Sequence, residues 1–312
     1  MNLIIIFLIG LISYCELSSQ TAKDSTFTNL DSLAIITVIP KKTELKHGEP
    51  LIIAVNFQII KDWHIYWRNP GDSGLETKFE WDLGEDFTLI NTRYEIPHKH
   101  TTDEITDYIY ENNVTYFFEF AANSSVTNDK LVKGKLSCSY LICNEICIPK
   151  TYETTFEFDI TSTPKPDPSW FNNETFFKYV QIEHKYYELK NEYKHLDFGS
   201  DNESKFSINK EQKTITFEIE KATFDEFLGK NKIDEVILNS KPDNLLLFPY
   251  INGVINNSAN LEFEIKSDKI LIKTKIDDYA TTFPEEITAI FINEKKWNDK
   301  FKAFEITFTK SK

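Results

Sequence analysis

The sequence has little glycine, little positive charge and only one long apolar run. Nine Gly in 312 residues leave little room for a glycine-rich phosphate loop, and none occurs. The 35 Lys and Arg are outnumbered by 49 Asp and Glu, which gives a formal charge of −14. Nucleic acid requires a concentrated basic face, so we expect no nucleic-acid partner. The apolar run, Leu3–Ile12, is about half as long as the roughly 20 residues that a membrane-spanning helix needs, which argues against a multi-span membrane protein.

The N-terminus predicts export. Leu3–Ile12 follows a short polar start and precedes small residues between Ser13 and Ser19. This order is typical of a secretory signal peptide, so we assign residues 1–19 to a signal and expect no membrane span after its removal. A buried apolar segment and lipidation at Cys15 are the alternatives, although Tyr14 stands where a lipidation signal has a small residue. Export would place the chain in an oxidising compartment, where paired cysteines persist as disulfides.

The chain after residue 30 predicts an all-β fold. Its apolar segments are short, aromatic and β-branched and are bounded by Gly, Pro, Asn and Asp, which is typical of antiparallel strands. Turn signals at residues 47–50 and 69–72 separate these segments, and their regular spacing favours a β-sandwich over a parallel α/β sheet. The expected strands are Leu33–Ile39, Leu51–Ile60, His64–Tyr66, Thr115–Phe120, Lys133–Cys143 and Thr154–Ile160.

Three prolines between residues 163 and 168 mark a boundary between two domains. They make a stiff linker, residues 163–168, between a first domain at residues 20–162 and a second at residues 169–312. Ser169 can cap a helix that extends to about Lys190 with apolar residues at three- and four-residue spacing. Strands then return, so we expect a mostly β second domain with one N-terminal helix. Its expected strands are Thr214–Ile219, Glu235–Leu238, Leu261–Ile265, Ile270–Ile276, Ile287–Ile292 and Ala303–Phe308.

Three cysteines are left once the signal is set aside, and an odd number implies a free thiol, an intermolecular bond or chemistry. On one extended strand Cys138 and Cys143 would lie roughly 16 Å apart, whereas a disulfide tolerates a Cα separation of only about 7 Å. Residues 144–146 can form a reversal that brings Cys143 opposite Cys147 at the mouth of a hairpin. We therefore expect a Cys143–Cys147 disulfide, and we expect Cys138 to be a buried small residue.

A bridge at a hairpin tip suits exchange chemistry better than stabilisation. The loop-entropy model gives about 2 kcal/mol for a ring of five residues, against nearly 5 kcal/mol for a ring of about a hundred. A turn tip can be reached by another protein's thiolate, and exchange requires access to one sulfur. Glu145, between the two sulfurs, disfavours a thiolate, which favours a relay reduced by a dedicated donor over a general oxidant. A merely structural bridge is the alternative.

Three segments carry a family resemblance: Trp63–Leu75 (WHIYWRNPGDSGL), Phe79–Leu83 (FEWDL) and Leu141–Pro149 (LICNEICIP). Together they resemble the periplasmic N-terminal region of DsbD-type protein-disulfide reductases, most of all the branch that includes the ScsB-like copper-tolerance proteins. The resemblance covers about residues 30–160. It continues more weakly through Phe248–Tyr250 and Gly253–Ile255.

The resemblance implies an immunoglobulin-like sandwich in the periplasm. Its cysteine pair, which Cys143 and Cys147 match, would take electrons from a membrane-embedded thiol donor and pass them to periplasmic thiol-disulfide oxidoreductases. We expect no cofactor and no metal.

An aromatic cap loop shields the cysteine pair in relatives. Residues 107–111 look similar to it, with Tyr108 and Tyr110 as its aromatic residues, although Ile109 stands where relatives have Gly. Relatives usually continue into a membrane domain and a thioredoxin-like domain. This sequence ends at Lys312 with neither, so we expect that either a separate membrane protein supplies the electrons or the chain is a detached paralogue with another task.

A second interpretation remains open. His64, His98, His100 and Cys138 have side chains that suit copper or zinc, but their spacing matches no defined site, and a solvated loop after Pro97 explains two of the histidines. The alternative function is therefore a non-catalytic β-sandwich binding module with a structural disulfide, serving copper handling or partner recognition.

The other residues of the Trp-rich motif are expected to be structural. We expect Trp63, Trp67 and Trp81 to pack in the core and its turns. Arg68 and Asp72 are expected to form a local pair across the intervening turn, which is worth little where it is exposed.

Overall fold

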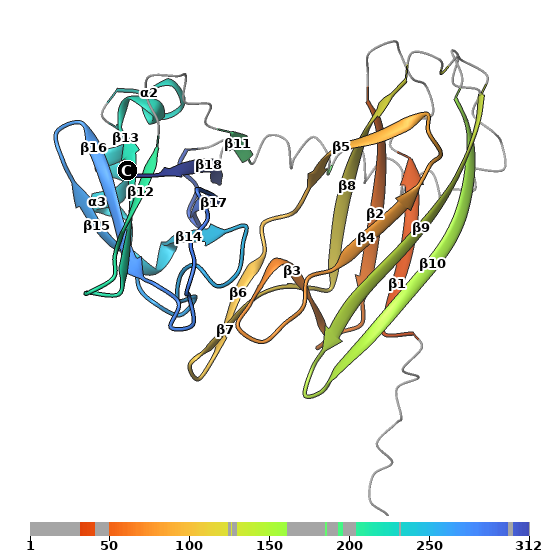
Figure 1. The fold of residues 1–312 in the computed structure, drawn as a ribbon, viewed down its shortest axis with the longest axis horizontal. Coiled ribbons are helices and arrows are strands. Elements are labelled where there is room, and N and C mark those ends of the chain that lie inside the picture. The colour runs from red at the N-terminus through yellow and green to blue at the C-terminus, as the bar shows by residue number, and fades with distance from the viewer. Residues whose placement is uncertain are drawn as a thin grey trace, which may run out of the picture.

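The computed structural model describes residues 32–40, 50–123, 126, 130–160, 185, 193–195, 204–230, 232–298 and 302–311. The expected signal peptide, the linker at residues 163–168 and, apart from Lys185, the helix expected at residues 169–190 lie outside these ranges. The described strands form two units, one before residue 161 and one after residue 192 (Figure 1). None of the described helices is long and apolar enough to cross a membrane.

The first unit is a sandwich of two antiparallel sheets, which confirms the expected all-β class. One described sheet has the strand order β1-β2-β8-β5, and the other has the order β10-β9-β3-β7-β6, with β4 also paired to β9. The bounds are β1 (Ala34–Pro40), β2 (Leu51–Ile59), β3 (His64–Gly71), β4 (Lys78–Asp82), β5 (Phe87–Arg93), β6 (His98–Thr102), β7 (Ile105–Glu111), β8 (Asn113–Ala122), β9 (Lys130–Cys143) and β10 (Cys147–Ile160).

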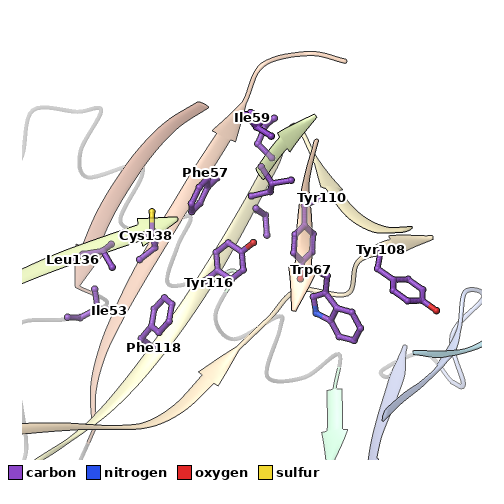
Figure 2. Packing of buried hydrophobic residues seen from close by; sticks show 14 of the residues in the cluster. Ile53, Phe57, Ile59, Trp67, Tyr108, Tyr110, Tyr116, Phe118, Leu136 and Cys138 are labelled. Atoms are coloured by element: carbon purple, nitrogen blue, oxygen red, sulfur yellow. The ribbon is translucent and has the colours of Figure 1, made fainter. Parts of the chain in front are cut away.

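Aromatic side chains fill the space between these sheets. Phe57 of β2 and Tyr116 and Phe118 of β8 are buried. They meet Phe79 and Trp81 of β4 with ring centroids 4.8–6.3 Å apart. Residues two apart on one strand point to the same face, so the pleat brings these rings into one layer, in which Figure 2 shows Phe57, Tyr116 and Phe118. Each such ring pair contributes about 0.5–1.5 kcal/mol beyond the area that it buries.

Strands β4 to β7 are absent from the sequence-based list. Strand β4 (KFEWD) alternates but is only five residues long, whereas β5 and β6 lack a clear apolar alternation. His98 and His100 lie on strand β6, which pairs with β7, rather than in a loop. All five residues of β6 are exposed. Residues 107–111, which the resemblance likened to a cap loop, lie in β7 and pair with β3 on one side and β6 on the other. Residues 106–110 are all buried, because β7 is an inner strand of its sheet.

The second unit is built on one mixed sheet with the order β14-β17-β18-β12-β13-β16-β15, and β11 also pairs with β18. Strands β11 and β12 run parallel to β18, and the other described pairs are antiparallel. The bounds are β11 (Tyr193–His195), β12 (Lys205–Asn209), β13 (Thr214–Glu220), α2 (Ala222–Leu228), α3 (Lys232–Asn239), the 3-10 turn η2 (Pro242–Asn244), β14 (Leu245–Pro249), β15 (Glu262–Ile265), β16 (Lys269–Lys275), β17 (Glu286–Asn293) and β18 (Ala303–Lys310).

One expected strand of this unit is wrong. Residues 235–238 belong to helix α3, although their apolar, β-branched composition is typical of a strand. Ile233 and Ile237 are buried four residues apart, which is the spacing of one helix face. Asp234 and Glu235 lie in the first turn, where a negative charge interacts favourably with the helix dipole. The two short helices α2 and α3 replace this strand in the fold.

The two units share an aromatic contact between β3 and β7 on one side and β14 on the other. Trp67 is 1% exposed, and its ring centroid lies 5.9 Å from that of Tyr108, 6.3 Å from Phe248 and 5.6 Å from Tyr250. Tyr108 and Phe248 are themselves buried, 4.5 Å apart. Figure 2 places Trp67 and Tyr108 on the side of the core that faces the second unit. The first core therefore continues into the second unit.

Arg68 and Asp72 serve this contact instead of forming the expected local pair. The Arg68 guanidinium lies 4.0 Å from the centre of the Tyr250 ring and 5.0 Å from that of Tyr94, which is cation–π geometry. Asp72 accepts hydrogen bonds from the Thr106 backbone amide and from the Asn257 side chain. The expected packing role of the tryptophans is confirmed: Trp67 lies in the core, and Trp63 and Trp81 pack against it.

Replacing Trp67 with Ala should lower the free energy of unfolding by about 3–5 kcal/mol, because it opens a cavity among rings of both units. Denaturant unfolding measures the loss. The control is Tyr279→Ala, since Tyr279 is 91% exposed and its truncation should change stability by no more than about 0.5 kcal/mol. A loss at Trp67 no larger than the control's would contradict a shared core.

Candidate functional site

Cys143 and Cys147 form a disulfide at the tip of the β9–β10 hairpin. Cys143 ends β9, Cys147 begins β10, and the two residues are directly paired with Cα atoms 4.1 Å apart. The turn between them is closed by a backbone hydrogen bond of 3.0 Å from Asn144 N–H to Ile146 C=O. The disulfide that the hairpin geometry predicts is confirmed.

The two sulfur-bearing residues differ in exposure. Cys143 is 1% exposed and packs with Tyr66, Ile109 and Leu141 on the outer face of the sheet. Cys147 is exposed, as are the three turn residues before it, and Ile146 is 59% exposed. Cys147 is therefore the more accessible residue of the pair, and the exposed Ile146 precedes it in the turn.

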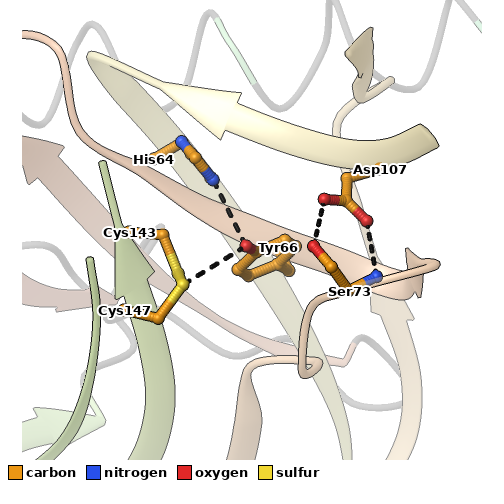
Figure 3. Close-up of a disulfide and its surroundings, with 6 residues drawn as sticks. All are labelled: His64, Tyr66, Ser73, Asp107, Cys143 and Cys147. Atoms are coloured by element: carbon orange, nitrogen blue, oxygen red, sulfur yellow. Dashed lines mark hydrogen bonds between the residues drawn. A yellow bond between two sulfur atoms is a disulfide. The ribbon is translucent and has the colours of Figure 1, made fainter. Parts of the chain in front are cut away.

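Tyr66 is the aromatic residue beside the bridge. Its hydroxyl lies 3.9 Å from Cys147 Sγ and 3.3 Å from His64 Nε2 (Figure 3). A disulfide sulfur carries no proton, so the hydroxyl is the donor in the first contact, and a His64 ring protonated at Nε2 donates to the same oxygen. The pleat explains the arrangement, because His64 and Tyr66 are two residues apart on β3 and His64 lies opposite Cys143.

The groups beside the sulfur are held neutral. Burial, and next the Asp107 carboxylate, raise the pKa of Tyr66 above its usual value, which keeps the phenol protonated. Burial, and next the neighbouring His100, lower the pKa of His64, although Asp107 and Glu111 oppose this shift. Near neutral pH, Cys147 therefore has an uncharged hydrogen-bond donor beside it rather than a charged group.

A loop after β3 covers the other side of the Tyr66 ring. A Cβ atom on Gly74 would lie 2.1 Å from Tyr66 Cδ1, so only glycine fits at this position. The Ser73 backbone N–H and hydroxyl both donate to the Asp107 carboxylate, at 2.8 and 2.5 Å (Figure 3). The loop is thus tied to β7 while its backbone contacts the ring.

The structure does not bring Tyr108 and Tyr110 to the disulfide. Their side chains lie on the core face of β7, where Tyr108 contacts Trp67 and Phe248 and the Tyr110 hydroxyl donates to the Glu95 carbonyl at 2.6 Å. The period of two along a strand places Ile109, between them, on the face of Cys143. Sequence reasoning missed Tyr66, although its position two residues after His64 in an expected strand was the available signal.

Cys138 lies apart from the bridge. It is 1% exposed in the sandwich core, as expected, and burial raises its thiol pKa to about 12. The histidines also come together on the outer face, where the His64 and His100 rings lie 6.2 Å apart. Within the described ranges, no group of three His, Cys, Asp or Glu side chains is placed to hold a metal ion.

The family model for the N-terminal part of the thiol:disulfide interchange protein DsbD matches residues 38–159, which include the whole disulfide hairpin and Tyr66. This part of the chain is a DsbD-type N-terminal domain. The matched residues contain nearly all of the sandwich. The family is described as that of a thiol:disulfide interchange protein, and the matched residues include the Cys143–Cys147 pair.

Two solved structures are similar to the chain. The N-terminal periplasmic domain of ScsB from Proteus mirabilis matches with a TM-score of 0.50 and 13% identity, over 90% of this chain and 94% of that one. The reduced N-terminal domain of DsbD from Neisseria meningitidis matches with a TM-score of 0.27 and 14% identity, over 40% of this chain and 85% of that one. The first match shows that the fold of this chain, across both units, is similar to that of a solved structure. Comparison with curated proteins returns no significant match.

Iodoacetamide should modify the three thiols of the reduced protein in a fixed order. Cys147 should react first because it is exposed, Cys143 more slowly, and Cys138 last. A pKa of about 12 leaves only about one Cys138 thiol in ten thousand ionised at pH 8. Peptide mass spectrometry at timed intervals gives the order, and the same reaction in denaturant should remove it. Equal rates for Cys138 and Cys147 in the folded protein would contradict the assignment.

The His64 pKa, read from ring-proton NMR shifts, should lie below 6.5 and should rise in His100→Ala, because the neighbouring group that lowers it is removed and only burial still lowers it. His98→Ala is the matched control and should leave it unchanged. The unfolded state takes up a proton at His64 before the folded state does, so this residue's contribution to stability should fall as pH drops below about 6.5. An unchanged His64 pKa in His100→Ala would refute the interaction.

Proposed function

We propose that this protein relays reducing equivalents by thiol–disulfide exchange through Cys143 and Cys147. The observation that carries the proposal is the asymmetric disulfide at the hairpin tip, with one exposed sulfur-bearing residue, one buried one and a neutral hydroxyl beside the exposed one. It occurs within a DsbD-type domain. A five-residue ring stabilises by only about 2 kcal/mol in the loop-entropy model, so stability alone is a weak reason for a bridge here.

The exposure difference supports one order of steps. A thiolate of a dithiol donor attacks Cys147 Sγ, the S–S bond breaks, and Cys143 leaves as a thiolate that takes up a proton. The donor's second thiolate then attacks the mixed disulfide and releases Cys147, so the donor is oxidised to a disulfide and the pair is reduced to two thiols. In the second half of the cycle, Cys147 attacks the acceptor's disulfide and Cys143 resolves the mixed disulfide.

The domain type supports a proposal for the partners. We propose a membrane-embedded thiol protein as donor and periplasmic thiol-disulfide oxidoreductases as acceptors, with this chain exported to the periplasm. The ScsB domain that shares the fold is described as periplasmic, which supports that location. The role amounts to protein-disulfide reductase activity, with the protein cycling between dithiol and disulfide.

The reduction potential of the pair tests the proposal. The purified protein is equilibrated with glutathione or dithiothreitol buffers, and its thiols are counted by mass after alkylation. A potential above about −260 mV would place the pair among exchange catalysts, whereas one below about −300 mV would mark a structural bridge and favour the binding-module alternative.

A trapping experiment tests the order of attack. Cys143→Ala, reduced and then mixed with oxidised glutathione, should accumulate a mixed disulfide at Cys147, because the resolving thiol is gone. Cys147→Ala is the matched variant and should form far less, since Cys143 is buried. Cys138 is present in both variants and should stay unmodified. More adduct on Cys143 than on Cys147 would reverse the assignment.

A further inference from the structure

Hydrogen bonds between the two units hold the start of the loop that follows β3, and the central group is a buried amide. Asn69 is fully buried, and its Nδ2 donates to the backbone carbonyls of Pro249 at 2.9 Å and Ile251 at 3.3 Å. Its Oδ1 accepts from the Gly71 N–H at 3.1 Å. From the other side, Asn252 Nδ2 donates to the Gly71 carbonyl at 2.7 Å. The segment after β14 therefore fixes the backbone where this loop begins.

A second buried amide, that of Asn257, binds the next residue of the loop, Asp72. Asn257 is 4% exposed, its Nδ2 donates to Asp72 Oδ1 at 2.8 Å, and its Oδ1 accepts from the Tyr108 hydroxyl at 3.1 Å. The other oxygen of Asp72 accepts from the Thr106 N–H at 2.7 Å. Two directional hydrogen bonds, one to each oxygen, thus hold the Asp72 carboxylate, and the Lys99 ammonium interacts with it electrostatically.

The loop that these hydrogen bonds hold contacts Tyr66, whose hydroxyl lies beside the sulfur of Cys147. Ser73 is held by Asp107, and Gly74 lies so close to the Tyr66 ring that it admits no side chain. The Tyr66 hydroxyl in turn lies 3.9 Å from Cys147 Sγ. Only Ser73 therefore separates Asp72, whose carboxylate Asn257 holds, from the Gly74 backbone that covers the ring.

We propose that the second unit acts as a positioning element for the redox site, in which Asn257 holds Asp72 and thereby fixes the Gly74 backbone and the Tyr66 hydroxyl beside Cys147. This inference rests on the proposed function for the chemistry of the sulfur pair. The Tyr66 hydroxyl contacts the reacting sulfur, whereas Asn257 and Asp72 act only through the position of Tyr66. The second unit thereby acquires a role in exchange that needs no cysteine of its own.

The Asn257→Asp variant tests the coupling, because it sets a second carboxylate against Asp72 and breaks the hydrogen bond. The readout is the pKa of the Cys147 thiol in the reduced full-length protein, from the pH profile of its alkylation. A displaced hydroxyl no longer stabilises the thiolate, so this pKa should rise by about half a unit or more. Tyr66→Phe, which lacks the hydroxyl, should raise it as well.

Two further variants separate positioning from charge and from folding. Asn256→Asp adds the same charge one residue away, where the side chain accepts only from Ser258 of its own loop, and should leave the Cys147 pKa unchanged. The swap Asp72→Asn with Asn257→Asp restores the bond between these two positions with donor and acceptor exchanged. It leaves an acceptor oxygen for the Thr106 N–H and for the Tyr108 hydroxyl, and should restore the pKa. If Asn257→Asp does not fold, Asn257→Ala replaces it, with thermal melting to confirm folding.

A double-mutant cycle decides the route. In the Tyr66→Phe background, Asn257→Asp should add nothing further to the Cys147 pKa. An equal shift with and without the hydroxyl, or no shift in Asn257→Asp, would overturn the proposal, as would an unshifted pKa in Tyr66→Phe. These outcomes are independent of the reduction potential and the trapping result, so the relay and the positioning role can fail separately.

Discussion

Strand β3 presents alternate residues to two faces, and both the disulfide site and the contact between the units depend on this alternation. Tyr66 points outward to Cys143 and Cys147, whereas Ile65 and Trp67 point inward to the core. The register with β7 then shifts between Tyr66 and Gly71, so the chain leaves the regular ladder and turns toward the second unit. A shift of one residue in β3 would place Trp67 beside the sulfurs and Tyr66 in the core.

Buried amides give this contact its specificity. Asn69 donates to two backbone carbonyls across the contact between the units, and Asn257 both donates and accepts across it. A buried polar group without partners costs about 1–3 kcal/mol, so an arrangement that displaces these carbonyls or the carboxylate is disfavoured. The aromatic rings around Trp67 supply apolar area, and the amides select one relative placement.

Features that depend on residues close together in the sequence could be predicted, whereas contacts between distant segments could not. The spacing of Cys143 and Cys147 made the hairpin disulfide predictable, because a turn within five residues leaves few ways to place the two cysteines other than opposite each other. The strand interpretation of residues 235–238 failed because tertiary packing of Ile233 and Ile237 outweighed strand propensity. Strand β6 has no apolar pattern to detect. The approach of Tyr66 to Cys147 and of Asn257 to Asp72 depends on pairings far apart in the chain, which no local pattern encodes.

The disulfide joins two strands that are already paired along fourteen residues each. Breaking the S–S bond therefore releases almost no chain, and the β9–β10 ladder continues to hold the two cysteines opposite each other. Reduction should leave the outline of the protein nearly unchanged, so a docking partner meets the same shape in either oxidation state. In the proposed relay, any preference of a partner for one form would then originate at the sulfur atoms and the hydroxyl beside them, and reduction potentials rather than shape would set the direction of electron flow.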